Sequence, residues 1–470
     1  MKKFKFFTSV LFCLILFASN VVVAQTKTLG LDETLNIIRK FHPVAKQADL
    51  LVSLANASLQ SSRGAFDPAV YVRSERKTFD GKNYYSYSNP ELKIPTWFGI
   101  DVKAGFENNI GDRMEPMFSP GKSTYAGFSL PVLKNLLLDK RRAALQQGKI
   151  MVNMSSQDRL LAVNDLLYDA VDAYWAWVSA HQSYRILTNT LQINAVRFEN
   201  TKQLFVGGDR AAIDTVEALS QLQSIETMQI QSWLNLQKQR LLLSNFLWKE
   251  SDTPFELTED IIPDSSWNNV LIQGYPLPSL VDALASASTN HPKLLMLGFK
   301  TDMLEVDRKL KFQGLLPTFD INYNFLNKGY GSKGFFETAL FQNNYKYGFL
   351  FGLPLFQRQS RGEYSMSKIK LKNQQLENMQ QRLEIENKVK YSFNELLSLQ
   401  QQVSIFDQNV KNLKLLLGAE ETRFSIGESS LFLINTRENK LLESEQKLAE
   451  LKTKFFKSII SVQWSAGQLR

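Results

Sequence analysis

The sequence predicts an α+β membrane protein in which one structural repeat occurs twice. Each copy is expected to contain a helical segment, a strand pair, a very long helix and a returning helix. Three observations support this prediction: an internal duplication, a change from helical to strand periodicity within each copy, and a long heptad pattern after each strand region.

The N-terminus has the pattern of a secretory signal peptide, predicted over residues 1–24. Three lysines precede an apolar run, and small residues stand before Gln25. Cys13 is the only cysteine and lies inside the apolar run without the preceding small residue of a lipoprotein cleavage site, so we expect no lipid anchor. The rest of the chain offers no disulfide, thiolate metal site or cysteine nucleophile.

The charge balance gives no indication of a nucleic-acid partner. The chain has 55 basic and 46 acidic residues, a net charge of +9, which falls to +6 without the three lysines of the predicted signal. No block of lysine and arginine stands out as a nucleic-acid footprint. No run of eighteen apolar residues follows the signal, so no transmembrane helix is predicted, and a membrane-spanning part would have to be a β-barrel.

The duplication places the same short motifs in the same order in both halves. The first repeat is predicted at 25–250, a connecting, equatorial segment at 251–279 and the second repeat at 280–470. In both halves, 25 residues separate the proline of a His-Pro pair from a second proline. The matching motifs are Leu31–Leu35 and Leu280–Leu284, His42-Pro43 and His291-Pro292, Pro68 and Pro317, and Phe128–Leu133 and Phe351–Phe356.

Within each half, the apolar period changes from helix to strand. Residues 32–62 and 280–313 have apolar positions three or four apart, which predicts helices. Alternating apolar residues then predict strands within 69–133 and within 318–356. Segments of about 10 alternating residues match the length of a tilted membrane strand.

Long coiled-coil helices are predicted next, at 141–204 and 361–423, because apolar residues follow a heptad grid there. At 1.5 Å per residue each would be roughly 95 Å long, near the depth of a bacterial periplasm. Glycine turns lead into returning helices at 211–248 and 430–466.

About four principal strands per chain cannot close a barrel alone, since about eight are needed. Unpaired strand edges are not tolerated in lipid, so several copies must complete the barrel. The first strand region is longer, with 63 residues from Pro68 to Pro131 against 37 from Pro317 to Pro354. The surplus, near 79–121, is either an extra hairpin or an enlarged extracellular loop.

The residues do not predict an enzyme, a cofactor or a metal site. His42 and His291 stand at equivalent positions before proline, which favours a structural role, and His181 has no second ligand at i+4 on its helix. The glycines near 207 and 427 lie between two helices rather than after a strand, unlike a phosphate-binding or dinucleotide loop.

Taken together and in duplicate, the His-Pro pairs, the strand-ending Leu-Pro motifs and the glycine turns resemble the TolC-like family of outer-membrane factors over the whole chain after the signal. The resemblance implies a homotrimer with a 12-stranded β-barrel in outer-membrane lipid, continued through the periplasm by an α-helical barrel of coiled coils. It also implies docking to a periplasmic adaptor (membrane fusion) protein and an inner-membrane RND or ABC transporter. The implied function is the exit duct of a tripartite efflux pump or a type I secretion system.

The same resemblance implies that the glycine turns form the periplasmic entrance, where the adaptor docks. Counted from Gly208, Asp214 takes the acidic position of the family, whereas the matching positions of the second repeat, Leu433 and Thr436, carry no charge. We therefore expect a different latch, made by Arg210, Asp214 and Glu217. The predicted entrance and docking residues are Gly207, Gly208, Arg210, Asp214, Glu217, Gly427, Glu428 and Ser429.

Two other classes remain open from the sequence. A coiled-coil structural or adhesive protein of the envelope would explain the heptads but not the duplicated strands. A nutrient-uptake barrel would need many more strands and no helices of this length. The transported substrate and the class of pump are not encoded in any motif that we find.

Overall fold

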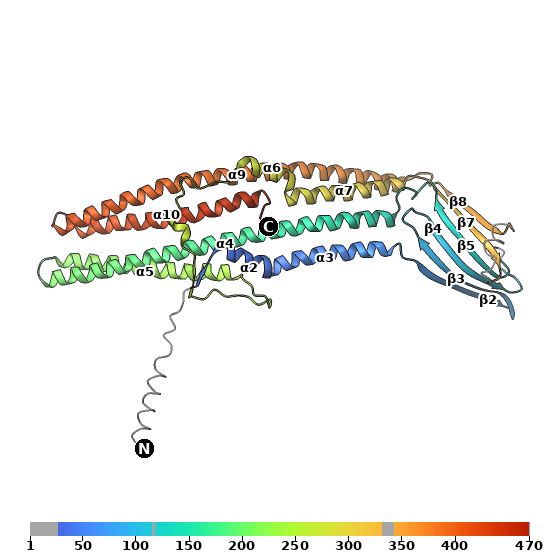
Figure 1. Ribbon diagram of the computed structural model, residues 1–470, viewed down its shortest axis with the longest axis horizontal. Helices are drawn as coiled ribbons and strands as arrows, with labels where there is room; N and C mark the ends of the chain where they lie inside the picture. Colours follow the sequence, from blue (N-terminus) through green and yellow to red (C-terminus); the bar gives the residue numbers. More distant parts are fainter. Residues whose placement is uncertain (1–26, 115–116, 118, 331–342, 470) are drawn as a thin grey trace, which may run out of the picture. The chain divides into compact units, whose positions relative to one another are not determined.

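A computed structural model describes residues 27–114, 117, 119–330 and 343–469 (Figure 1). The predicted signal peptide, with Cys13 and Gln25, lies outside the described residues. The chain divides into two compact units. We call Met1–Lys46, Val163–Ala283 and Lys388–Arg470 the helical unit, and Gln47–Ala162 with Leu284–Asn387 the sheet unit.

Two helical hairpins dominate the helical unit. The long helix α4 (Lys140–Val206) is followed by the returning helix α5 (Ala212–Ser244), and α9 (Arg358–Ser425) is followed by α10 (Leu431–Ser465). Figure 1 shows each returning helix lying beside the long helix that precedes it. The observed bounds lie within four residues of those expected from the sequence, 141–204, 211–248, 361–423 and 430–466.

The core of the helical unit is rich in aromatic side chains from the middle of α4 and the end of α10. Trp175 and Phe456 stack with ring centres 5.3 Å apart, and Trp267 packs edge-on against both. The hydroxyl of Tyr174 donates to the carbonyl of Leu29 at 3.1 Å. This bond joins α4 to a small parallel sheet formed by β1 (Lys27–Leu29) and β6 (Ile261–Pro263). A 3-10 helix at Ser266–Asn269 follows.

The predicted helices at 32–62 and 280–313 are each broken at the His-Pro pair. The observed helices are α2 (Leu31–Phe41), α3 (Pro43–Gly64), α6 (Leu280–Asn290) and α7 (Pro292–Gln313). Proline disfavours the helical conformation in the residue before it, and His42 and His291 are extended, with ψ of 133° and 121°. The prediction of one continuous helix in each half is therefore wrong at this position.

The histidine side chains start the second helix of each pair. His42 Nδ1 accepts a hydrogen bond from the backbone N–H of Val44, and His291 Nδ1 accepts one from Lys293, both at 3.2 Å. Each imidazole therefore satisfies one of the N–H groups that a helix leaves unpaired at its start.

The sheet unit contains six antiparallel strands in the order β2-β3-β4-β5-β7-β8. The first half contributes four of these strands, two more than the strand pair predicted for it. The surplus segment forms an additional hairpin, β3–β4. The strands are β2 (Ala69–Phe79), β3 (Lys82–Pro95), β4 (Asp101–Ile110), β5 (Gly121–Pro131), β7 (Thr318–Lys328) and β8 (Tyr345–Gly352).

Candidate functional site

The turns of both helical hairpins have the same backbone geometry. Gly208 and Gly427 adopt φ of 83° and 82°, in the left-handed region that glycine enters without steric cost. The N–H of Asp209 bonds to the carbonyl of Leu204, and the N–H of Glu428 bonds to that of Arg423, both at 2.9 Å. These bonds close a Schellman motif at the end of each long helix. Gly208, rather than Gly207, is therefore the structural equivalent of Gly427.

Arg210 joins the two hairpins at their turns. Its guanidinium carbon lies 4.1 Å from the centre of the Phe424 ring, and its Nη2 donates to the Phe424 carbonyl at 3.4 Å. A cation over an aromatic face is attracted by the ring quadrupole. Among the described residues, no ion pair or side-chain hydrogen bond joins Arg210 to Asp214 or Glu217. Within one chain, the structure thus places Arg210 on the opposite hairpin rather than on the predicted carboxylates.

Asp214 and Glu217 have different surroundings. Asp214 lies in the first turn of α5 and is half-buried, a position where a carboxylate stabilises the helix through the macrodipole. Glu217 lies one turn further along and accepts a hydrogen bond of 3.3 Å from the side-chain amide of Asn435 on α10. Glu217 is therefore in contact with the opposite hairpin, whereas Asp214 has a local role in the start of its own helix.

The two hairpins meet near the turns through a polar interface that was not predicted from the sequence. Glu438 on α10 is 5% exposed and accepts hydrogen bonds from Arg197 and Asn194 on α4, both at 2.9 Å. Gln221 and Asn439 exchange two amide hydrogen bonds, at 2.7 and 3.3 Å. A polar residue at a core position of a heptad is a signal that could have revealed this interface.

Further along the same helices, the contact is apolar. Leu187, Ile225 and Leu442 form a buried cluster there. Apolar side chains are also buried at the start of α10, where Leu431 and Ile434 are 1% and 2% exposed. Buried apolar residues therefore lie on both sides of the hydrogen-bonded stretch of α10.

Ser429, the equivalent of Arg210 in the second turn, bonds within its own hairpin. Its hydroxyl donates to Glu420 at 2.5 Å, and Arg437 approaches the other oxygen of the same carboxylate at 3.9 Å. Glu428 contributes its carbonyl, which accepts from Arg423 at 3.4 Å. The second turn is thus closed on itself, and the first turn holds the contact between hairpins.

The six-stranded sheet has one apolar and one polar face. One row of paired residues crosses all six strands on the apolar face: Val70, Leu92, Ala104, Ala126, Phe325 and Tyr345. A neighbouring row on the opposite face contains Lys93, Lys103, Gly127, Asn324 and Lys346. The apolar face has no cover within the described chain, since Val70 and Phe349 are 70% and 71% exposed.

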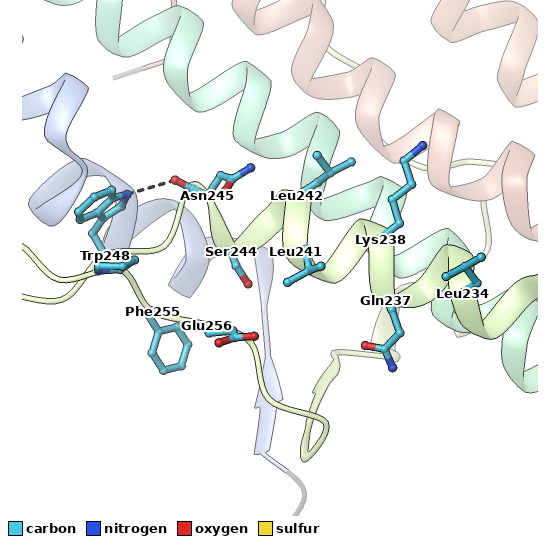
Figure 2. Close-up of a pocket in the computed structure, with 11 residues that line it drawn as sticks. Leu234, Gln237, Lys238, Leu241, Leu242, Ser244, Asn245, Trp248, Phe255 and Glu256 are labelled. Atoms are coloured by element: carbon cyan, nitrogen blue, oxygen red, sulfur yellow. Dashed lines mark hydrogen bonds between the residues drawn. The ribbon is translucent and has the colours of Figure 1, made fainter.

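An open apolar groove of about 740 Å³ lies elsewhere, between the C-terminal half of α5 and the segment after it. Figure 2 shows Leu234, Leu241 and Leu242 on the helix, with Trp248 and Phe255 on the segment. None of the predicted entrance residues lines this groove. It contains no arrangement of side chains that indicates a reaction.

Among the described residues, no helix is both long enough and apolar enough to cross a membrane. In the same part of the chain, no group of three or more histidine, cysteine, aspartate or glutamate side chains could hold a metal ion.

Comparison with models of protein families and with curated proteins finds no match. Solved structures do match, over nearly the whole chain. The Campylobacter jejuni CmeC outer membrane channel is 14% identical, with 93% of this chain and 86% of that chain covered and a TM-score of 0.66. The Vibrio cholerae outer membrane protein VceC is 11% identical, with coverages of 93% and 96% and a TM-score of 0.65.

The open state of the Neisseria gonorrhoeae MtrE outer membrane channel is 11% identical, with coverages of 96% and 94% and a TM-score of 0.66. At these identities the likeness establishes a shared fold. The mixed helical and strand architecture of this chain is that of outer-membrane channel proteins.

Proposed function

Because the chain has the TolC-like outer-membrane factor fold, we propose that it is the exit duct of an export system. In this proposal it conducts substrates passively from an inner-membrane transporter across the periplasm and the outer membrane. The observation that carries the proposal is a two-faced sheet and two long helical hairpins in one chain that matches outer-membrane channels over more than nine tenths of its length.

The two faces of the sheet fit a wall between lipid and water. Five of the six described strands of the sheet have 10 to 14 residues, enough to cross a bilayer at a tilt, which takes about 9–11, and β8 has 8. The uncovered apolar face would contact lipid, and the opposite face would line a water-filled lumen. Trp97 and Phe98, in the β3–β4 turn, are 71% and 69% exposed, as expected for aromatic residues at a membrane interface.

An open sheet of this kind leaves unpaired backbone groups on its two edge strands, β2 and β8. Such edges are not tolerated in lipid, so each must pair with a neighbouring chain. Three copies arranged around one axis would close the wall, which is the homotrimer that the sequence resemblance implies.

The helices fit a conduit through the periplasm. Helices α4 and α9 contain 67 and 68 residues, and at 1.5 Å per residue each is roughly 100 Å long. The glycine turns would then form the periplasmic entrance, and exposed apolar residues beside them, such as Val206 and Ile426, would be available to an adaptor protein. The adaptor would connect the duct to an RND or ABC transporter.

Membrane fractionation combined with chemical crosslinking tests the location and the assembly. We expect the protein in the outer-membrane fraction as a crosslinked trimer. Recovery as a soluble or inner-membrane monomer would contradict the proposal. Deletion in a strain that lacks redundant homologues should raise sensitivity to exported compounds or abolish secretion of a protein cargo, and an unchanged export profile would count against an export role.

A further inference from the structure

The extra hairpin β3–β4 changes the number of strands that each chain contributes. In the duplicated pattern, β2 corresponds to β7 and β5 corresponds to β8. Each of these strand pairs lies between the matching prolines of its half. In the second half, β7 and β8 pair directly, with Thr318 opposite Gly352. In the first half, β3 and β4 lie between β2 and β5.

The hairpin is built into both faces of the sheet. On the apolar face, Leu92 and Ala104 continue the row that crosses all six strands. On the polar face, the ring of Tyr125 on β5 covers Gly105 on β4, where a Cβ atom would lie 2.6 Å from its hydroxyl. The same hydroxyl donates to Glu91 on β3 at 2.6 Å. One side chain of β5 thus reaches across both inserted strands, and it is only 3% exposed.

The turn of the hairpin is attached to the start of α4. Arg141 forms an ion pair of 2.9 Å with Asp101, and Arg142 donates to the carbonyl of Phe98 at 3.4 Å. Gly99, in this turn, has φ of 91° and lies against the Arg142 guanidinium, where a Cβ atom would come within 2.8 Å. These contacts hold the hairpin in line with the other strands rather than as a separate loop.

We propose that the assembled barrel has 18 strands instead of 12, because three copies would each contribute six. This inference rests on the proposed trimeric duct. Barrel diameter grows roughly linearly with strand number, so the exit would be about 1.5-fold wider than a twelve-stranded barrel of the same tilt. Barrels of 16 to 18 strands leave an aqueous channel.

The wider exit suits large, hydrated cargo. Charges of both signs alternate on the polar face and pair with each other, as Lys93 does with Asp101 at 3.1 Å and Arg73 with Glu75 at 2.7 Å. A lumen lined in this way has no field of a single sign to select ions. The hairpin therefore sets the width of the exit.

Engineered pairs of cysteines test whether β3 and β4 lie between β2 and β5 in the membrane. Ala104 lies opposite Ala126 in the β4–β5 register, so Ala104→Cys with Ala126→Cys should form an intrachain crosslink. The matched control is Val72→Cys with Ala126→Cys. If β2 and β5 paired directly, as β7 and β8 do in the second half, the same register would place Val72 opposite Ala126. With β3 and β4 between them, they are about three strand spacings, roughly 14 Å, apart.

Both pairs are made in full-length protein with Cys13→Ala, which removes the only native cysteine, and crosslinks are identified by mass spectrometry of digested membranes. A crosslink in the first pair alone supports the inference. A crosslink in the control pair, or in neither pair, overturns it.

A second measurement uses the wild-type protein. Neutral polymers of graded size are added to the external side of planar bilayers, and the largest polymer that enters the channel is recorded. We expect a cut-off diameter about 1.5-fold above that of a twelve-stranded barrel. A channel with the smaller cut-off would overturn the 18-strand barrel but leave the exit duct intact. No channel and no crosslinked trimer would overturn both.

Discussion

Arg210, in the turn before α5, stacks on the ring of Phe424, near the end of α9, with 4.1 Å between its guanidinium carbon and the ring centre. The two residues are 214 positions apart in the sequence. Their contact connects one hairpin turn to the other. We therefore regard this pair as the latch of the proposed entrance, with Glu217 and Asn435 as the next contact along the same interface.

We expect Arg210→Ala to raise the single-channel conductance in planar bilayers. A cation–π contact at an exposed site contributes about 0.5–1 kcal/mol, and three copies in a trimer would act on one concerted opening. Phe424→Ala should have a similar effect, and the double variant should add little, because both changes remove one contact. If Asp214→Ala alone gives the increase, the latch lies between subunits and involves the carboxylate that the sequence suggests.

The buried carboxylate of Glu438 gives a prediction about stability. Arg197→Leu removes its charged partner and should lower the free energy of unfolding by about 3 kcal/mol, because an unpaired charge remains buried. Arg197→Leu with Glu438→Leu should recover part of the loss. The control is Lys411→Leu, which breaks an ion pair whose lysine is 65% exposed and should cost at most about 1 kcal/mol. Thermal unfolding in detergent would compare the variants. Equal losses of stability in Arg197→Leu and Lys411→Leu would contradict this prediction.

The two adjacent glycines of the first turn provide a matched pair. Gly208→Ala should cost about 1–2 kcal/mol, because its φ of 83° lies in the left-handed region, although a Cβ atom there would meet no other atom within 4 Å. Gly207 has no such φ, and its Cβ atom would make only contacts of 3.6 Å, so Gly207→Ala should be close to neutral. A comparison of the two thermal midpoints checks this. A larger loss for Gly207→Ala would mean that the turn is assigned wrongly.

The helical unit should lose stability on acidification through His181. Burial lowers the pKa of His181 to about 4, with further lowering by the nearby Arg185 and Arg240. The ordinary pKa of histidine is about 6.5. Between these values the unfolded chain binds a proton that the folded chain does not bind, so this contribution to stability is complete above pH 6.5 and is lost as the pH falls toward 4.

His181→Gln should therefore show a smaller decrease of the thermal midpoint between pH 7 and pH 4.5 than the wild type. His42, whose pKa is also lowered by burial, should keep part of the dependence in that variant. The same pH profile in wild type and variant would show that His181 is not the titrating group.

The sequence alone determined the elements that depend on local patterns. Heptads define the long helices, and the glycines at 208 and 427 mark the turns, because each feature acts on the backbone within a few residues. The helix breaks at the two His-Pro pairs are equally local, but the sequence prediction gave continuous helices there. The duplicated order of these features was enough to indicate the fold that the solved channels share with this chain.

The tertiary structure decided which distant segments meet. Periodicity placed strands in the surplus segment as one possibility, but only the pairing of Leu92 with Ala104 and of Ala104 with Ala126 shows that they widen the sheet. In the same way, Arg210 could contact the carboxylates of Asp214 and Glu217, four and seven positions along the chain, or a ring on the other hairpin, and sequence spacing does not distinguish these partners. A side-chain contact depends on the relative position of two backbones, and residues 214 positions apart acquire that position only when both hairpins have folded.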